Sequence, residues 1–183
     1  MVAAIMAETT SPMTTVLPEE LVSLARRVIE ANKAIGRRIA VAESCTGGLV
    51  SAALTEIPGS SAVFEAGFVT YSNAQKQALL GVSEDVLDTF GAVSIATAWA
   101  MAQGALTRSG ADVAVSITGI AGPDGGSEMK PVGTVVFARA EHGNANDNVV
   151  ADLRRFENEG RGKIRLQAAL CALELLLPEA PAP

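Results

Sequence analysis

The sequence predicts an α/β protein built on a mixed, mostly parallel β-sheet. Short apolar segments typical of strands alternate along the chain with longer segments whose apolar residues recur at helical spacing. That alternation is typical of a layered α/β sheet. The last two predicted strands, residues 132–140 and 148–156, are separated only by a short polar loop. A connection this short joins antiparallel strands, so the sheet cannot be wholly parallel.

Each predicted element has its own start and stop signals. The first helix, residues 18–36, begins at a proline and ends at a glycine. A strand over 37–44 ends in polar residues, and glycines then open a helix over 46–59, for which Thr46 is a possible N-cap. The other elements follow in order: a strand at 66–72, helices at 73–81 and 83–91 capped by Asn73 and Ser83, an Ala-rich helix at 94–110, a strand at 112–119, the two paired strands, and a helix at 162–177.

Composition and charge narrow the class of protein. The 183 residues are 49% hydrophobic and 19% charged, which favours one compact domain and argues against disorder. We expect this domain over residues 18–178, with a poorly ordered tail at 1–17 and a Pro-rich tail at 179–183. A formal net charge of −6 disfavours a nucleic-acid partner. The sequence shows no signal peptide and no apolar run of about 20 residues. We therefore expect a cytoplasmic protein with no membrane partner.

Two glycine-containing loops follow predicted strands and are expected to meet. One is ESCTGG, Glu43–Gly48, and the other runs from Thr118 to Gly133 with five glycines. Ligands of open α/β sheets bind beyond the carboxyl ends of the strands. Backbone N–H groups at such turns can hold an anion or a developing oxyanion. An ordinary strand-to-helix turn explains the first loop equally well, and a long hairpin loop is the plain alternative for the second.

The first loop offers two candidate nucleophiles, Ser44 and Cys45. A thiol is the better nucleophile, whereas strand alternation shows only that the two side chains point in different directions. Lys76 lies near the start of a predicted helix, where the helix dipole and burial would both favour its neutral, proton-accepting form. An exposed lysine is nevertheless the common case. The one histidine, His142, lies in a polar loop and is expected to be solvated.

Several segments together resemble one protein family. The stretches AESCTGG, GFVTYSNAQK, GAVS, SITGIAGPDGGSEMKPVGTV and GRGKIRLQAAL resemble the CinA C-terminal domain family and, within it, the stand-alone nicotinamide-nucleotide amidohydrolases. The resemblance runs from about Leu21 to Leu177. It implies a three-layer α/β/α sandwich. It also implies deamidation of nicotinamide mononucleotide to nicotinic acid mononucleotide and ammonia, in pyridine nucleotide recycling, with no cofactor and no metal. The Ala-rich helix around Trp99 suggests a homo-oligomer, with a dimer expected.

The resemblance also implies roles for individual residues. It makes Ser44 the nucleophile and Lys76 its proton acceptor, in a dyad that forms an acyl-enzyme and needs no histidine. Tyr71 is expected to orient the dyad or the ligand. The two arginines of the last helix suit a phosphate, although FENEGR stands where the family usually has FxGDR. The residues expected to contact substrate are Cys45, Thr46, Gly47, Gly48, Asn73, Thr118, Gly119, Ala121, Gly122, Arg161 and Arg165.

An alternative function belongs to a different class. The chain could be a non-catalytic nucleotide-binding module of the competence/damage-inducible kind. Such a module would require neither Ser44 nor Lys76, so the presence of both favours the enzyme.

Overall fold

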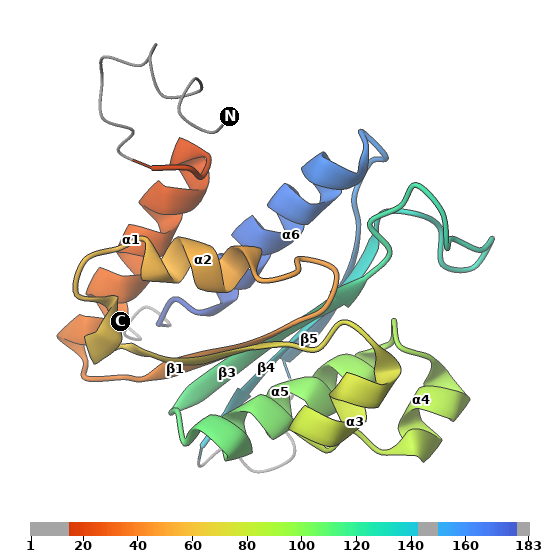
Figure 1. Ribbon diagram of the computed structural model, residues 1–183, viewed down its shortest axis with the longest axis horizontal. Coiled ribbons are helices and arrows are strands. Elements are labelled where there is room, and N and C mark those ends of the chain that lie inside the picture. Colours follow the sequence, from red (N-terminus) through yellow and green to blue (C-terminus); the bar gives the residue numbers. More distant parts are fainter. Residues whose placement is uncertain (1–14, 143–149, 179–183) are drawn as a thin grey trace, which may run out of the picture.

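A single mixed sheet forms the middle of the molecule. The computed structural model describes residues 15–142 and 150–178, and within them five strands are ordered β2-β1-β3-β4-β5 (Figure 1). β1 pairs in parallel with β2 and β3, while β4 pairs antiparallel with β3 and β5. The predicted mixed sheet is confirmed, but parallel pairing accounts for only two of these four pairs. The strands are β1 (Ile39–Glu43), β2 (Phe64–Val69), β3 (Val113–Gly119), β4 (Thr134–Glu141) and β5 (Val150–Arg155).

Helices cover both faces of the sheet, which confirms the three-layer α/β/α sandwich (Figure 1). One face carries α1 (Glu19–Ala34), α2 (Leu49–Thr55) and α6 (Arg161–Leu175). The other carries α3 (Asn73–Leu80), α4 (Glu84–Phe90) and α5 (Ile95–Ser109). A short 3-10 helix, η1 (Ser60–Ala62), precedes β2.

Strand alternation divides the interior into two cores. In β1, Ile39 and Val41 belong to the core beneath α1, α2 and α6, whereas Ala40 and Ala42 belong to the core beneath α5. All four side chains are fully buried. A strand buried on both faces is apolar throughout, so β1 stays in place and can present its polar carboxyl end at a fixed position.

The segment between β2 and α3 differs from its prediction. The strand ends at Val69 rather than at residue 72, so Tyr71 lies in the connection to α3. The N-cap of α3 is Ser72, whose Oγ accepts a hydrogen bond from the N–H of Gln75, and not Asn73. A hydroxyl and an amide are both good caps, so the sequence alone could not choose between neighbouring candidates.

The carboxyl ends of β1, β2 and β3 lie at one edge of the sheet. Glu43, the last residue of β1, stands in register with Val69 of β2 and Ile117 of β3. The loops ESCTGG and TGIAG therefore lie side by side, as the sequence predicted. His142 is exposed and follows β4 at the opposite edge, beside the start of β3.

Some predictions fall beyond the described residues. The tails expected at 1–17 and 179–183 lie outside them except for residues 15–17, and so does most of the loop between β4 and β5. Within the ranges 15–142 and 150–178, no helix combines the length and apolar character required to cross a membrane.

Candidate active site

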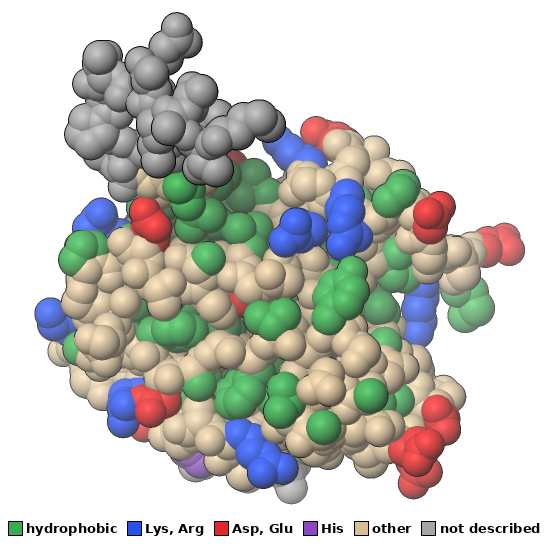
Figure 2. Space-filling model, in the orientation of Figure 1, with side chains coloured by type: hydrophobic (Ala, Val, Ile, Leu, Met, Phe, Trp, Pro, Cys, Tyr) green, Lys and Arg blue, Asp and Glu red, His purple; other side chains and the backbone are tan. Residues whose placement is uncertain are grey.

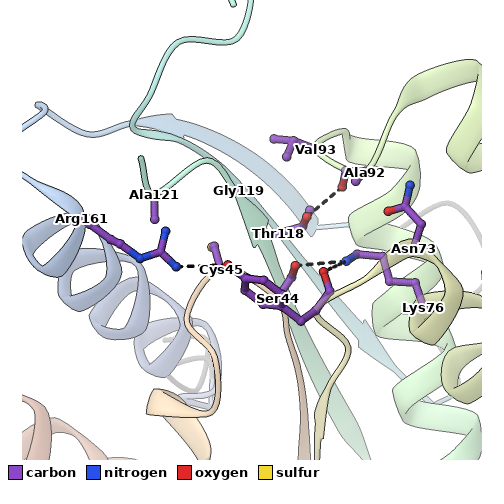
Figure 3. A pocket seen from close by; sticks show the side chains of 11 residues that line it. Ser44, Cys45, Asn73, Lys76, Ala92, Val93, Thr118, Gly119, Ala121 and Arg161 are labelled. Atoms are coloured by element: carbon purple, nitrogen blue, oxygen red, sulfur yellow. Dashed lines mark hydrogen bonds between the residues drawn. The ribbon is translucent and has the colours of Figure 1, made fainter. Parts of the chain in front are cut away.

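A cavity of about 250 Å³ opens at the carboxyl edge of the sheet (Figure 3). Its walls come from the turn after β1, the start of α3, the loop between α4 and α5, the end of β3, and the first residue of α6. Most of the predicted site residues meet there. The lining residues are Ser44, Cys45, Tyr71, Asn73, Lys76, Ala92, Val93, Thr118, Gly119, Ala121 and Arg161.

Ser44 and Lys76 form the closest pair of reactive groups in this cavity, and Figure 3 shows them pointing toward each other. The Nζ atom of Lys76 lies 3.1 Å from the Oγ atom of Ser44. It also lies 2.9 Å from the carbonyl oxygen of Thr70 and 3.5 Å from that of Tyr71. The Lys76 side chain is 1% exposed, so the expected alternative of a solvated surface lysine is wrong.

The surroundings of Lys76 suit a neutral amine. Burial lowers the pKa of Lys76 below its usual value of 10.5. No carboxylate in the described part of the chain pairs with it. A neutral amine has two N–H groups and one lone pair. The Thr70 carbonyl accepts from Lys76 Nζ at 2.9 Å, and a neutral Nζ would still have its lone pair available for a second partner.

Cys45 lines the same cavity but lacks these features. Burial, above all, raises the pKa of the Cys45 thiol to about 12. The thiol is therefore protonated at neutral pH, and a protonated thiol is a poor nucleophile. Of the two candidates that the sequence left open, Ser44 is the one whose reactive atom lies within hydrogen-bonding distance of Lys76 Nζ.

The turn after β1 is capped by Glu43 rather than by Thr46. The Glu43 carboxylate is fully buried and accepts from the N–H groups of Gly48, Val50 and Ser51 at 3.0, 3.1 and 2.8 Å. It also accepts from the Ser51 hydroxyl at 2.7 Å. Gly48 occupies the N-cap position of α2 with a φ of 91°, a conformation that glycine adopts without strain.

Only some N–H groups of this turn remain free for a ligand. The N–H of Gly47 donates to the carbonyl of Ser44 at 3.1 Å, and that of Gly48 donates to Glu43. No oxygen of the described residues accepts from the N–H groups of Cys45 and Thr46. The Cys45 N–H lies against that residue's own thiol, and Thr46 is fully buried and does not line the cavity. The N–H of Cys45 is therefore the one in this turn that combines a position on the cavity with no oxygen acceptor.

The loop after β3 enters the site only with its first residues. Thr118 donates from Oγ1 to the carbonyl of Ala92 at 2.8 Å, which joins β3 to the loop between α4 and α5. Ala121 lines the cavity, whereas Gly122 does not; the Gly122 carbonyl accepts a hydrogen bond from Arg161. Ala92 and Val93 also line the cavity, although the sequence assigned them no role. The motif GAVS contained them and was the available signal.

Two arginines of α6 lie beside the turn after β1. Arg161 donates from Nη1 to the Gly122 carbonyl at 2.8 Å and from Nη2 to the Tyr71 hydroxyl at 3.1 Å. Arg165 donates from Nε to the carbonyl of Cys45 at 3.2 Å and from Nη2 to that of Thr46 at 2.7 Å. Basic side chains gather on this face between the N-terminal ends of α2 and α6 (Figure 2). Arg161 thus borders the cavity, while Arg165 holds the backbone next to it.

Comparisons with known proteins agree with this architecture. The family described as the CinA C-terminal domain matches residues 21–180. A relative from Enterobacter agglomerans, named nicotinamide-nucleotide amidohydrolase PncC, is 53% identical over 149 residues, which cover 81% of this chain and 88% of the relative. A putative competence-damage inducible protein from Symbiobacterium thermophilum is 61% identical over 108 residues, which cover 59% of this chain and 25% of that protein.

A solved structure of similar sequence also has the same fold. The competence/damage inducible protein CihA from Agrobacterium tumefaciens is 51% identical in sequence and superposes with a TM-score of 0.84. The match covers 88% of this chain and 96% of that one.

Proposed function

The chain belongs to the CinA C-terminal domain family, and on that premise we propose that it is an amidohydrolase that deamidates nicotinamide mononucleotide through a Ser44–Lys76 dyad. Relatives of nearly the same length carry the name nicotinamide-nucleotide amidohydrolase. The single observation that carries the mechanism is the buried Lys76 amine, 3.1 Å from the Ser44 hydroxyl. The products are nicotinic acid mononucleotide and ammonia.

Acylation begins when Lys76 takes the proton of the Ser44 hydroxyl. The serine oxygen attacks the carboxamide carbon, and the carbonyl oxygen becomes an oxyanion. We assign this oxyanion to the N–H of Cys45, which lines the cavity next to Ser44. A single donor of this kind contributes about 3 kcal/mol to the transition state. The tetrahedral intermediate collapses when Lys76 returns the proton to the nitrogen, which leaves as ammonia.

Deacylation repeats the same steps with water. Lys76 accepts a proton from a water molecule, the water oxygen attacks the ester carbon, and the N–H of Cys45 binds the second oxyanion. Collapse breaks the bond to Ser44 Oγ, which regains its proton from Lys76. The carboxylic acid product then leaves, and the dyad is restored to its starting state.

The surroundings of the dyad suit a nucleotide. The cavity of about 250 Å³ is slightly smaller than the usual range for small-molecule sites, so a nucleotide would extend beyond it. Two residues at the rim of the cavity could contact the part of the nucleotide that extends beyond it. They are Tyr71, which is 63% exposed, and Arg161, which donates to the Tyr71 hydroxyl. An exposed aromatic ring can stack on a cationic pyridinium ring, and a guanidinium can bind a phosphate. We assign the nicotinamide ring to the cavity and the phosphate to Arg161.

The non-catalytic alternative is disfavoured by the burial of Lys76. Burying an amine without a carboxylate partner is costly, and a module that only binds nucleotides has no use for it. The phosphate role expected for Arg165 is left out of this proposal, because its guanidinium donates to the carbonyls of Cys45 and Thr46. A homodimer stays a prediction. Light scattering would test it.

The test is ammonia release from nicotinamide mononucleotide, measured with the wild type and the Ser44→Ala and Lys76→Met variants after treatment with a chelator. We expect turnover in the wild type and a loss of at least about 1,000-fold in each variant, because the two residues act as a unit. Lys130→Met is a matched control, since Lys130 bonds the Phe90 carbonyl outside the cavity. A folded wild type without turnover would refute the proposed function.

A further inference from the structure

The turn that carries Ser44 is held from two sides by residues outside the dyad. We propose that Glu43 and Arg165 are positioning residues whose hydrogen bonds hold this turn so that the N–H of Cys45, which lines the cavity, faces the substrate carbonyl. This inference rests on the proposed function and adds to it a reason for the geometry of the turn.

Glu43 holds the side of the turn that leads into α2. Its buried carboxylate accepts four hydrogen bonds, three from backbone N–H groups and one from the Ser51 hydroxyl. These bonds cap α2, and they also fix the backbone from Gly48 to Ser51 on which the turn ends.

Arg165 holds the opposite side. Its guanidinium donates to the carbonyls of Cys45 and Thr46, two successive peptide groups, and a Cβ added to Gly47 would lie 3.4 Å from its Nη2. In a planar trans peptide the C=O and N–H bonds point in opposite directions. Fixing the Cys45 carbonyl on Arg165 therefore turns the Thr46 N–H away from α6.

The remaining N–H group is fixed by the turn itself. The carbonyl of Ser44 accepts from the N–H of Gly47, so the N–H of Cys45, on the other side of the same peptide, points out of the turn. The orientation of the Cys45 N–H thus depends on contacts that its neighbours make. Small displacements of such donors reduce the rate strongly, because they act on the transition state.

The test is steady-state kinetics of ammonia release from nicotinamide mononucleotide with the Glu43→Gln and Arg165→Met variants. We expect kcat to fall about 10- to 100-fold in each while KM changes less than about threefold, because the lost interactions act mainly on the oxyanion. Asp112→Asn is the control for Glu43, since Asp112 caps the N–H of Arg38 at the far edge of the sheet. Lys163→Met is the control for Arg165, because Lys163 is an exposed cation on the same helix.

A second readout separates positioning from general damage to the fold. Thionicotinamide mononucleotide replaces the reacting oxygen with sulfur, a weaker hydrogen-bond acceptor. We expect the ratio of kcat for the amide to kcat for the thioamide to be lower in both variants than in the wild type. If Glu43→Gln does not fold, Ser51→Ala removes one of the four bonds and should lower the ratio in the same direction.

The outcomes are distinct. Folded Glu43→Gln and Arg165→Met variants with wild-type kcat and a wild-type amide-to-thioamide ratio would overturn the inference and leave the proposed function intact. A raised KM with unchanged kcat would also overturn it, because it would make Arg165 a substrate-binding residue. A wild type that releases no ammonia would overturn both.

Discussion

Replacing Lys76 with methionine tests, without any substrate, whether the pKa of Lys76 is lowered in the folded protein. Methionine fills a similar volume but removes the Nζ atom, with its contacts to Thr70 and Ser44. Thr70 is fully buried, so its carbonyl would lose its donor, at a cost of about 1–3 kcal/mol. The contact to the Tyr71 carbonyl, at 3.5 Å, is too long to add much. The variant should therefore be less stable than the wild type at high pH.

The difference in stability should shrink as the pH falls. The pKa of Lys76 is lowered in the folded state, so between that pKa and 10.5 the unfolded chain binds a proton that the folded chain does not. The free energy of unfolding of the wild type then rises with pH by up to about 1.4 kcal/mol per pH unit. This contribution is fully present above the unfolded pKa and is lost as the pH falls to the folded pKa. The methionine variant has no such group and lacks this slope.

Urea unfolding of both proteins between about pH 7 and about pH 10, at constant ionic strength, measures the two slopes. We expect the wild-type free energy of unfolding to rise relative to that of Lys76→Met across this range. Parallel profiles would mean that folded Lys76 keeps its ordinary pKa, and the assignment of Lys76 as proton acceptor would then be wrong.

Three further outcomes follow from the same geometry. Cys45→Ala should keep kcat for ammonia release within about threefold of the wild type, because a protonated thiol supplies no nucleophile; a loss as large as that of Ser44→Ala would contradict this. Arg161→Met should raise KM for nicotinamide mononucleotide about 10- to 100-fold, as expected for a lost charge-assisted bond, but leave KM for nicotinamide riboside unchanged. An equal effect on both substrates would rule out the phosphate assignment. Gly104→Ala should lower the free energy of unfolding by about 1–3 kcal/mol without changing kcat, because the added Cβ would overlap the carbonyl oxygen of Leu80; a neutral urea-unfolding result would contradict the packing of α3 on α5.

The sequence was sufficient to predict the layers and the location of the site. Strand and helix periodicities are local signals, and β1 shows why they sufficed: its apolar run ends at Glu43, where the polar turn begins. The rule that ligands bind at the carboxyl ends of strands then brought the turn after β1 and the loop after β3 together. Local signals predicted the Ser83 cap of α4 correctly, but they failed at the start of α3, where Ser72 rather than Asn73 is the cap.

The arrangement within the site depends on contacts between distant residues, which no local pattern encodes. Burial raises the pKa of the Cys45 thiol, and Lys76 Nζ lies 3.1 Å from Ser44 Oγ; both observations favour Ser44 as the proposed nucleophile, and neither could be predicted from local sequence. Glu43 looked like the first polar residue of a turn, yet its carboxylate binds donors five to eight residues later. The spacing of Arg161 and Arg165 predicts that they share a helix face, but not that Arg165 holds the backbone of Cys45.

The most direct test of the central claim is to trap the acyl-enzyme. Wild-type protein is mixed with nicotinamide mononucleotide, quenched with acid within the first turnover, and examined by mass spectrometry of the intact chain and its peptides. The account predicts an adduct equal in mass to the substrate minus ammonia, located on the peptide at Ser44 and missing from Ser44→Ala. An adduct on Cys45, or full turnover by Ser44→Ala, would contradict it.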